Sequence, residues 1–220
     1  ERFDRVPGPE EPLRLHVLDG TQMLNEPAFN KYASETIPNL KNLIGQCRNK
    51  ALARMEVFRW IVFNTMVGNS DSHLKNISFI VDHEGRRVSS FYDLLCTAVY
   101  HTRVFLDEGA VWPNEKLASP VAGANFFSEV TYDKLIDTGL ELGLSKSAAG
   151  REVGKIVGRL ADAADEIIAQ MESILADPAA PQGAPSPMTK AAERRMLRSI
   201  RSIVIADMLR YVRLPVAAAK

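Results

Sequence analysis

The fold is decided around Gly68-Asn69-Ser70-Asp71-Ser72-His73-Leu74-Lys75-Asn76, a polar stretch between two apolar segments. The preceding residues 50–67 are apolar on nearly every side of a helix, which predicts a buried central helix that ends at the glycine. The following residues 77–82 and 86–92 flank a glycine-containing turn and predict a β-hairpin. The polar stretch is therefore predicted to be a loop anchored at both ends by core elements, where a rigid scaffold can present functional side chains.

Most of the remaining chain is predicted to be helical. Apolar side chains recur mostly at spacings of three and four in residues 36–48, 131–142, 145–175 and 189–212. Residues 13–18 alternate enough to predict one short strand. The predicted fold class is therefore mainly α with a small β-hairpin component.

The composition is that of an ordinary globular protein. The chain has 220 residues, of which 46% are apolar, and this is enough for a sizeable core. Its 27 Lys and Arg balance its 27 Asp and Glu, which excludes a general electrostatic attraction to nucleic acids or membranes. No apolar run reaches the roughly 18 residues of a membrane span. Cys47 and Cys96 form no CxxC pair, which favours a reducing compartment, so we expect a cytoplasmic protein without a membrane partner.

The last two predicted helices carry opposite charge. Residues 161–177 contain five acidic side chains and no basic one. Residues 189–220 contain eight basic side chains against two acidic ones. Two antiparallel helices with complementary solvated faces would explain this pattern, and a nucleic-acid contact through the basic helix is the alternative.

Three polar side chains have the spacing that phosphoryl transfer to a hydroxyl requires. Asp71 precedes Asn76 by five residues, and the hairpin returns the chain to Asp93 at the end of an apolar segment. Such a set provides one carboxylate to accept or orient the proton, plus an amide and a second carboxylate to hold Mg²⁺ on the phosphates. The structural alternatives are Asp71 as a simple turn former and Asp93 as the N-cap of a helix from Leu94.

Two further side chains of the loop can carry positive charge. Lys75 is expected either to stabilise the transferring phosphoryl group or to be a solvated surface lysine. His73 is expected either to contact the nucleotide or to brace the loop by hydrogen bonds. A zinc site is not favoured, because the spacing is irregular and no ligands are paired among His73, His83, Cys96 and His101.

The sequence resembles a known family, the HipA-type toxin kinases, which are the serine/threonine kinases of bacterial type II toxin–antitoxin modules. The resemblance is to their C-terminal part, and four stretches carry it in the same order and spacing: Glu1-Arg2-Phe3-Asp4-Arg5, Phe58-Arg59-Trp60 to Gly68-Asn69, Asp71 to Asn76, and Phe91-Tyr92-Asp93-Leu94-Leu95. It implies a protein-kinase-like C-lobe that uses ATP and Mg²⁺. In that lobe Asp71 would be the catalytic base, and Asn76 and Asp93 would be the Mg²⁺ ligands.

The resemblance also implies a role for the first residues, which would form the hinge between two kinase lobes. The backbone of Glu1 and Phe3 would face the adenine of ATP, and Asp4 and His73 would lie near the ribose and phosphates. In the family, the phosphate-binding loop and the ATP-anchoring lysine precede this hinge, so the N-lobe is expected to be absent from this chain. We therefore expect residues 1–220 alone to bind ATP weakly and not to turn it over at a useful rate.

The implied domain organisation has four parts. They are an interlobe hinge (1–5), a helical C-lobe (6–177) that contains the catalytic loop (68–77) and the metal-binding segment (91–96), a Pro-rich linker (178–188), and a C-terminal helix packed on the C-lobe (189–220).

The activity implied by the resemblance is transfer of the ATP γ-phosphoryl group to a Ser or Thr hydroxyl of a protein, and an aminoacyl-tRNA synthetase is allowed as that substrate. The implied partner is a HipB-like DNA-binding antitoxin, so DNA would be reached only through the antitoxin. Two other classes remain open, a small-molecule phosphotransferase of kinase-like fold and a non-catalytic antitoxin-docking module. The small-molecule enzymes usually carry a His-Gly-Asp-type loop, which this chain lacks.

Overall fold

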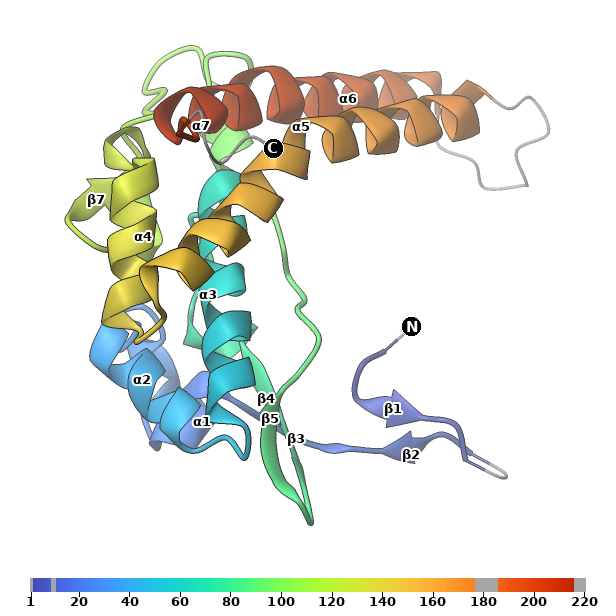
Figure 1. The fold of residues 1–220 in the computed structure, drawn as a ribbon. Coiled ribbons are helices and arrows are strands. Elements are labelled where there is room, and N and C mark those ends of the chain that lie inside the picture. Colours follow the sequence, from blue (N-terminus) through green and yellow to red (C-terminus); the bar gives the residue numbers. More distant parts are fainter. Residues whose placement is uncertain (1, 9–10, 177–185, 216–220) are drawn as a thin grey trace.

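Helix α3 (Lys50–Met66) is the central element of the computed structural model, which describes residues 2–8, 11–176 and 186–215 (Figure 1). It begins at Asn49, whose side chain accepts a hydrogen bond from the Leu52 backbone N–H. Its side chains are buried on several faces, including the large residues Phe58 and Trp60. The predicted buried central helix over residues 50–67 is therefore confirmed.

Three helices pack against α3: α2 (Ile37–Gly45), α4 (Tyr132–Glu141) and α5 (Lys146–Ala176). The side chains of Thr36 and Thr131 cap the N-termini of α2 and α4. These helices confirm the periodic segments predicted at 36–48, 131–142 and 145–175. A further short helix, α1 (Gly20–Leu24), was not predicted, because five residues are too few to show a helical period.

Within the described residues, the strands form three small antiparallel sheets. Strand β1 (Arg5–Val6) pairs with β2 (Leu13–Arg14), and β6 (Lys116–Val121) pairs with β7 (Ala124–Phe126). The third sheet has the order β3-β4-β5, from β3 (His16–Asp19), β4 (Ser78–Asp82) and β5 (Gly85–Val88). The prediction that the chain beyond the hairpin is helical is wrong for residues 116–126, which form β6 and β7. These strands are too short to show a clear alternation of apolar and polar residues in the sequence.

The predicted hairpin at 77–92 is present, but its second strand is shorter than expected. Strand β5 ends at Val88, whereas the prediction extended it to residue 92. After a last backbone bond from Ser89 N to Ser78 O, the chain leaves the sheet. Asp93 then has a φ of 55°, a left-handed conformation that no strand accommodates. Residues 91–96 are therefore an irregular segment that lies against the predicted catalytic loop (68–77).

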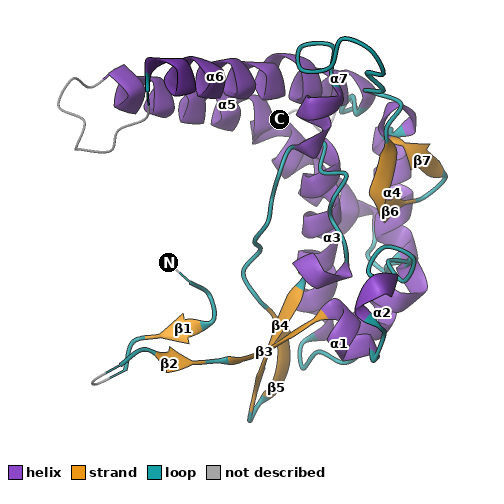
Figure 2. Cartoon of the chain, turned by 180° about the vertical axis from the view of Figure 1, so that it is seen from behind, coloured by secondary structure: helices purple, strands orange, loops and turns teal. Residues whose placement is uncertain are grey.

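The C-terminal helical region consists of α6 (Pro187–Ser199), the π-helical segment η5 (Ile200–Ile205) and α7 (Ala206–Tyr211). Figures 1 and 2 show α6 running back alongside α5. Arg198 pairs with Glu172 at 2.6 Å, and Arg201 pairs with Asp165 at 2.8 Å. These contacts confirm the prediction of two antiparallel helices with complementary charged faces. Within the described ranges, none of the helices combines the length and apolarity needed to traverse a bilayer.

Two boundaries of the predicted domain organisation are affected by these observations. Helix α6 already begins at Pro187, inside the predicted linker 178–188, and most of that linker lies outside the described residues. The predicted C-terminal helix 189–220 ends at Tyr211, and residues 216–220 lie outside the described part.

The predicted catalytic loop begins at Gly68, where both the backbone and the available space require glycine. Its φ is +70°, and a Cβ added there would lie 2.6 Å from Val204 Cγ1 and 2.9 Å from Ala98 Cβ. The left-handed conformation costs a non-glycine residue about 1–2 kcal/mol, and overpacking of a core adds about 1–3 kcal/mol.

Gly68→Ala is therefore expected to lower the free energy of unfolding by about 2–5 kcal/mol, as measured by urea denaturation. The matched control is Gly109→Ala, because Gly109 has a φ of +82° and nothing within 4 Å of an added Cβ. The control should show only the cost of the backbone conformation. Equal losses of stability in the two variants would contradict the tight packing around Gly68.

Candidate active site

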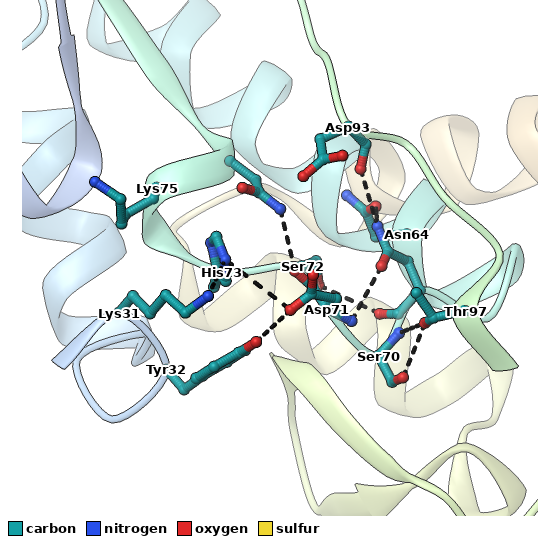
Figure 3. Close-up of polar contacts among 12 residues, drawn as sticks. Lys31, Tyr32, Asn64, Ser70, Asp71, Ser72, His73, Lys75, Asp93 and Thr97 are labelled. Carbon is teal, nitrogen blue, oxygen red and sulfur yellow. Dashed lines mark hydrogen bonds and ion pairs between the residues drawn. The ribbon is translucent and has the colours of Figure 1, made fainter. Parts of the chain in front are cut away.

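The predicted catalytic loop joins the end of α3 to the start of β4 and lies against the irregular segment 91–96. The short 3-10 turn η2 (Leu74–Asn76) completes it before the sheet begins. Because α3 and β4 are both core elements, the loop is fixed at its two ends. Figure 3 shows the polar side chains that meet there.

A buried amide, Asn69, connects three parts of this region. Its Nδ2 donates to Asn64 Oδ1 on α3 at 2.7 Å and to the backbone carbonyl of Asp93 at 3.2 Å. Its Oδ1 accepts the backbone N–H of Asp71 at 3.1 Å. The side chain of Asn64 is itself fixed by a 2.9 Å bond to the Trp60 carbonyl. The central helix, the backbone of Asp71 and the backbone of Asp93 are thus held in one arrangement.

Asp71 and Asn76 are linked directly. The Asn76 amide nitrogen donates to the Asp71 backbone carbonyl at 3.1 Å, and its oxygen accepts no hydrogen bond from any described residue. The Asp71 side chain is 45% exposed. Its Oδ1 accepts a hydrogen bond from the Tyr32 hydroxyl, whereas Oδ2 has no hydrogen bond within the described part of the chain. The carboxylate therefore has one fixed oxygen and one oxygen available to a ligand.

Asp93 presents a second available carboxylate. Its side chain is exposed and has no hydrogen bond or ion pair with the described residues, although its backbone is held by Asn69. No helix begins at Leu94, because the next helical turn is η3 (Thr97–His101), capped at Cys96 without a side-chain hydrogen bond. The interpretation of Asp93 as a helix N-cap is therefore wrong. A left-handed backbone at an aspartate is a strained conformation of the kind that is concentrated at functional sites.

His73 is buried and is held from two sides. Its Nε2 lies 2.8 Å from Lys31 Nζ and 4.0 Å from Asp71 Oδ1, and its ring meets the Tyr32 ring edge-on at 5.1 Å. Burial, and then the charge of Lys31, lower the pKa of His73, which favours the neutral imidazole, and in that form an unprotonated Nε2 accepts from the ammonium. These contacts are those of a brace for the loop. The predicted contact of His73 with the nucleotide is not tested by them.

Lys75 does not point toward Asp71. Its Nζ donates to Asp19 Oδ2 at 2.9 Å, and Figure 3 shows the side chain directed away from Asp71. The structure therefore neutralises this ammonium with a carboxylate outside the catalytic loop. A role for Lys75 at the phosphoryl group remains a prediction that would require it to leave Asp19.

The predicted hinge contacts the predicted metal-binding segment (91–96) through one pair of aromatic rings. Glu1 is outside the described residues. The Phe3 ring stacks on the ring of Tyr92, and the ring centroids are 5.3 Å apart. Tyr92 is the residue directly before Asp93 in the sequence. The Asp4 carboxylate accepts hydrogen bonds from Arg2 at 2.8 Å and from Arg5 at 2.5 Å. The pKa of Asp4 is lowered to about 2, chiefly by the hydrogen bond from Arg2. Phe3 is thus brought close to the site, whereas Asp4 is engaged by its neighbours.

Lys31 and Tyr32 lie at the site but were not predicted from the sequence, and Glu35 is close to them in the same segment between α1 and α2. Lys31 and Tyr32 contact His73 and Asp71 as described. The Glu35 carboxylate is buried, neither of its oxygens has a hydrogen-bond partner among the described residues, and burial raises its pKa well above the usual value. About 40 residues separate this segment from the catalytic loop, so no local spacing could have indicated the contact.

The donor set suits Mg²⁺ better than zinc. In the parts of the chain that the structure describes, no three His, Cys, Asp or Glu side chains gather as a cluster that could hold a metal. Mg²⁺ needs no such cage, since it takes one or two carboxylate or amide oxygens and completes its shell with water and phosphate. The free oxygens of Asn76 and Asp93 are donors of this kind, and they fit the ion.

Comparisons with known proteins show the family and the fold of the chain. The family model described as HipA-like C-terminal domain matches residues 1–174. The serine/threonine-protein kinase toxin HipA of Shewanella oneidensis is 32% identical over 116 residues, which are 46% of this chain and 27% of that protein. A solved complex of HipA, HipB and operator DNA from Shewanella oneidensis MR-1 superimposes with a TM-score of 0.73 at 24% identity. It covers 96% of this chain and 47% of that one, and it confirms the predicted mainly helical, kinase-like fold.

The central position of Asn69 can be tested by replacing only its donor group. Asn69→Asp would place a carboxylate oxygen against Asn64 Oδ1 and the Asp93 carbonyl, which are both acceptors. We expect a loss of about 3 kcal/mol in the free energy of unfolding, because a buried charge would lack partners. The exposed Asn114, whose side-chain oxygen only accepts from Ser128, is the matched control, and Asn114→Asp should change stability by less than about 0.5 kcal/mol. Similar urea midpoints for both variants would contradict the role of Asn69.

Proposed function

The chain belongs to the HipA-like C-terminal domain family, and we propose that it is the catalytic lobe of a serine/threonine protein kinase, the toxin of a toxin–antitoxin module. The reaction is transfer of the ATP γ-phosphoryl group to a Ser or Thr hydroxyl. One observation carries the proposal: Asn69 ties the backbones of Asp71 and Asp93 together while both carboxylates keep oxygens that no described residue uses.

Asp71 is the proposed catalytic base. Its Oδ2 is open to solvent-side ligands, so it could accept or orient the proton of a substrate hydroxyl. The backbone around it is held by Asn69 and Asn76, which fixes the carboxylate relative to the rest of the site. Such positioning is the main protein contribution to phosphoryl transfer.

Asn76 and Asp93 are the proposed Mg²⁺ ligands. When bound, the ion would neutralise charge on the phosphates of ATP. Asn76 is oriented for this because its nitrogen is engaged by the Asp71 carbonyl, which leaves its oxygen free. The backbone of Asp93 is held by the bond from Asn69 to its carbonyl.

The proposed nucleotide contacts are the backbone of Glu1 and Phe3, with Asp4 and His73 near the ribose and phosphates. The stacking of Phe3 on Tyr92 supports this assignment, since it puts the hinge next to Asp93. Lys75 can act at the phosphoryl group, as proposed, only if its ammonium leaves Asp19 and binds the phosphate instead.

The proposed partners follow from the family. The matched solved structure contains HipB and operator DNA, which supports a HipB-like antitoxin as partner and DNA contact through it. A protein substrate, with an aminoacyl-tRNA synthetase as one class, and a cytoplasmic location belong to the same proposal. Because the matched stretch covers only 27% of the HipA toxin, activity must be measured on the full-length product of the gene.

Asp71→Asn is expected to lower the rate of phosphoryl transfer by about 10²–10⁴-fold, because the amide cannot accept the proton. The measurement is transfer of labelled phosphate from Mg²⁺-ATP to casein as a probe protein. Thermal unfolding should be unchanged, since the fixed oxygen of residue 71 can still accept from Tyr32. Full activity of the variant would remove Asp71 from the role of base.

Co-purification of the antitoxin with the inactive variant would show separately whether docking survives without catalysis.

Asp93→Asn is expected to weaken the dependence on metal rather than the fold. Loss of the carboxylate charge should raise the Mg²⁺ concentration for half-maximal activity by about tenfold or more, and added Mg²⁺ should restore part of the rate. The exposed Asp107 lies outside the site, so Asp107→Asn is the control for a general charge effect. An unchanged Mg²⁺ titration in Asp93→Asn would count against Asp93 as a ligand.

A further inference from the structure

The segment between α1 and α2 reaches the catalytic loop with two adjacent side chains. Figure 3 shows Lys31 and Tyr32 approaching His73 and Asp71 from the side opposite Asp93. Neither residue belongs to the motif that suggested phosphoryl transfer, and the roles proposed above do not use them. Their contacts nevertheless fall on the proposed base and on the residue two positions after it.

Tyr32 controls the orientation of the proposed base. Its hydroxyl donates to Asp71 Oδ1, while Oδ2 remains without a partner in the described structure. A carboxylate held at one oxygen by a neutral donor has its second oxygen in a defined direction. The contact therefore orients Asp71 without consuming the oxygen that a substrate hydroxyl needs.

Lys31 is a cation without a carboxylate partner. Its Nζ lies 2.8 Å from His73 Nε2 and 4.7 Å from the centre of the Tyr32 ring, and no described Asp or Glu forms an ion pair with it. Lys75 differs, since Asp19 neutralises it at 2.9 Å. An uncompensated ammonium held by a neutral imidazole beside the base is available to an anionic group.

The segment is anchored, so these positions are not those of a loose loop. The Leu74 backbone N–H donates to the Lys31 carbonyl at 3.2 Å, which joins the segment to the catalytic loop. The Asn39 amide on α2 donates to the Ser34 carbonyl at 2.9 Å. Glu35, a residue of the same segment, is buried. Lys31 and Tyr32 therefore keep their places relative to Asp71.

We propose that Lys31 and Tyr32 are a second part of the phosphoryl-transfer site, in which Lys31 binds the transferring phosphoryl group and Tyr32 is a positioning residue for Asp71. The inference rests on the proposed kinase function. In the reaction, the bond between the γ-phosphorus and the bridging oxygen of ADP breaks, and a bond to the substrate oxygen forms. The hydroxyl proton passes to Asp71 Oδ2. Lys31 keeps its proton throughout and stabilises the charge on the phosphoryl oxygens.

The activity test uses the full-length product of the gene, with Mg²⁺-ATP and casein as the probe protein. Lys31→Met should lower kcat by about 10²-fold, with partial recovery in Lys31→Arg, which keeps the charge. Tyr32→Phe should lower kcat by about tenfold and leave the KM for ATP unchanged. Lys41→Met, at an exposed lysine on α2, is the control and should retain full activity.

A second readout does not depend on activity. The hydrogen bond to Asp71, followed by burial, raises the pKa of Tyr32 to about 12, and the other groups that face this phenol are Lys31, His73 and Glu35. The absorbance titration of the tyrosines should lose one high-pKa step in Tyr32→Phe. In Asp71→Asn that step should move down toward about 10, because the negative charge that holds the phenol proton is gone. Tyr100→Phe, at an exposed tyrosine, should leave the step in place.

Several results would overturn the proposal. Full activity of Lys31→Met would remove Lys31 from the phosphoryl group, as would a loss of activity in Lys75→Met that Lys31→Met does not share. An unshifted Tyr32 titration in Asp71→Asn would contradict the hydrogen bond between Tyr32 and Asp71. Faster transfer in Tyr32→Phe would mean that Tyr32 obstructs the substrate. Full activity of Asp71→Asn would instead refute the kinase site itself. An inactive Asp71→Asn with active Lys31→Met and Tyr32→Phe would refute only the present inference.

Discussion

The three hydrogen bonds of the Asn69 side chain are the interaction on which the candidate site depends. A single buried amide satisfies a carbonyl of the irregular segment, a side chain of the central helix and a backbone N–H of the catalytic loop. Buried polar groups are costly unless paired, so this amide is stable in only one arrangement of the three. The backbones of Asp71 and Asp93, 22 positions apart in sequence, therefore have a fixed relation before any ligand binds.

The rest of the fold supports this connection. Helix α3 is buried by α2, α4 and α5, so its C-terminal end, where Asn64 and Gly68 lie, is rigid. The left-handed turn at Gly68 directs the chain out of the helix, and β4 takes it back into the core. The strained backbone of Asp93 is stabilised by the hydrogen bond that Asn69 donates to its carbonyl. Rigidity of this kind suits a reaction in which the protein mainly positions charged groups.

Much of this could be predicted from the sequence, because the decisive signals are local. The apolar helix, the polar loop and the hairpin are contiguous, and the spacing from Asp71 to Asn76 is short. The direction of a long side chain is not a local property. Lys75 lies in the loop but pairs with Asp19, whereas Lys31, some 40 residues earlier, reaches His73. Tertiary packing decides between such lysines, and a single sequence does not contain that information.

The central claim is that Asn76 and Asp93 hold the metal while Asp71 faces the hydroxyl that is phosphorylated. The most direct measurement is a crystal structure of the full-length gene product with a non-hydrolysable ATP analogue and Mn²⁺ in place of Mg²⁺, with the ion located by its anomalous signal. We expect an anomalous peak within coordination distance of Asn76 Oδ1 and an Asp93 carboxylate oxygen, with Asp71 Oδ2 open toward the γ-phosphate. An ion bound elsewhere, with Asp93 directed away from the phosphates, would contradict it.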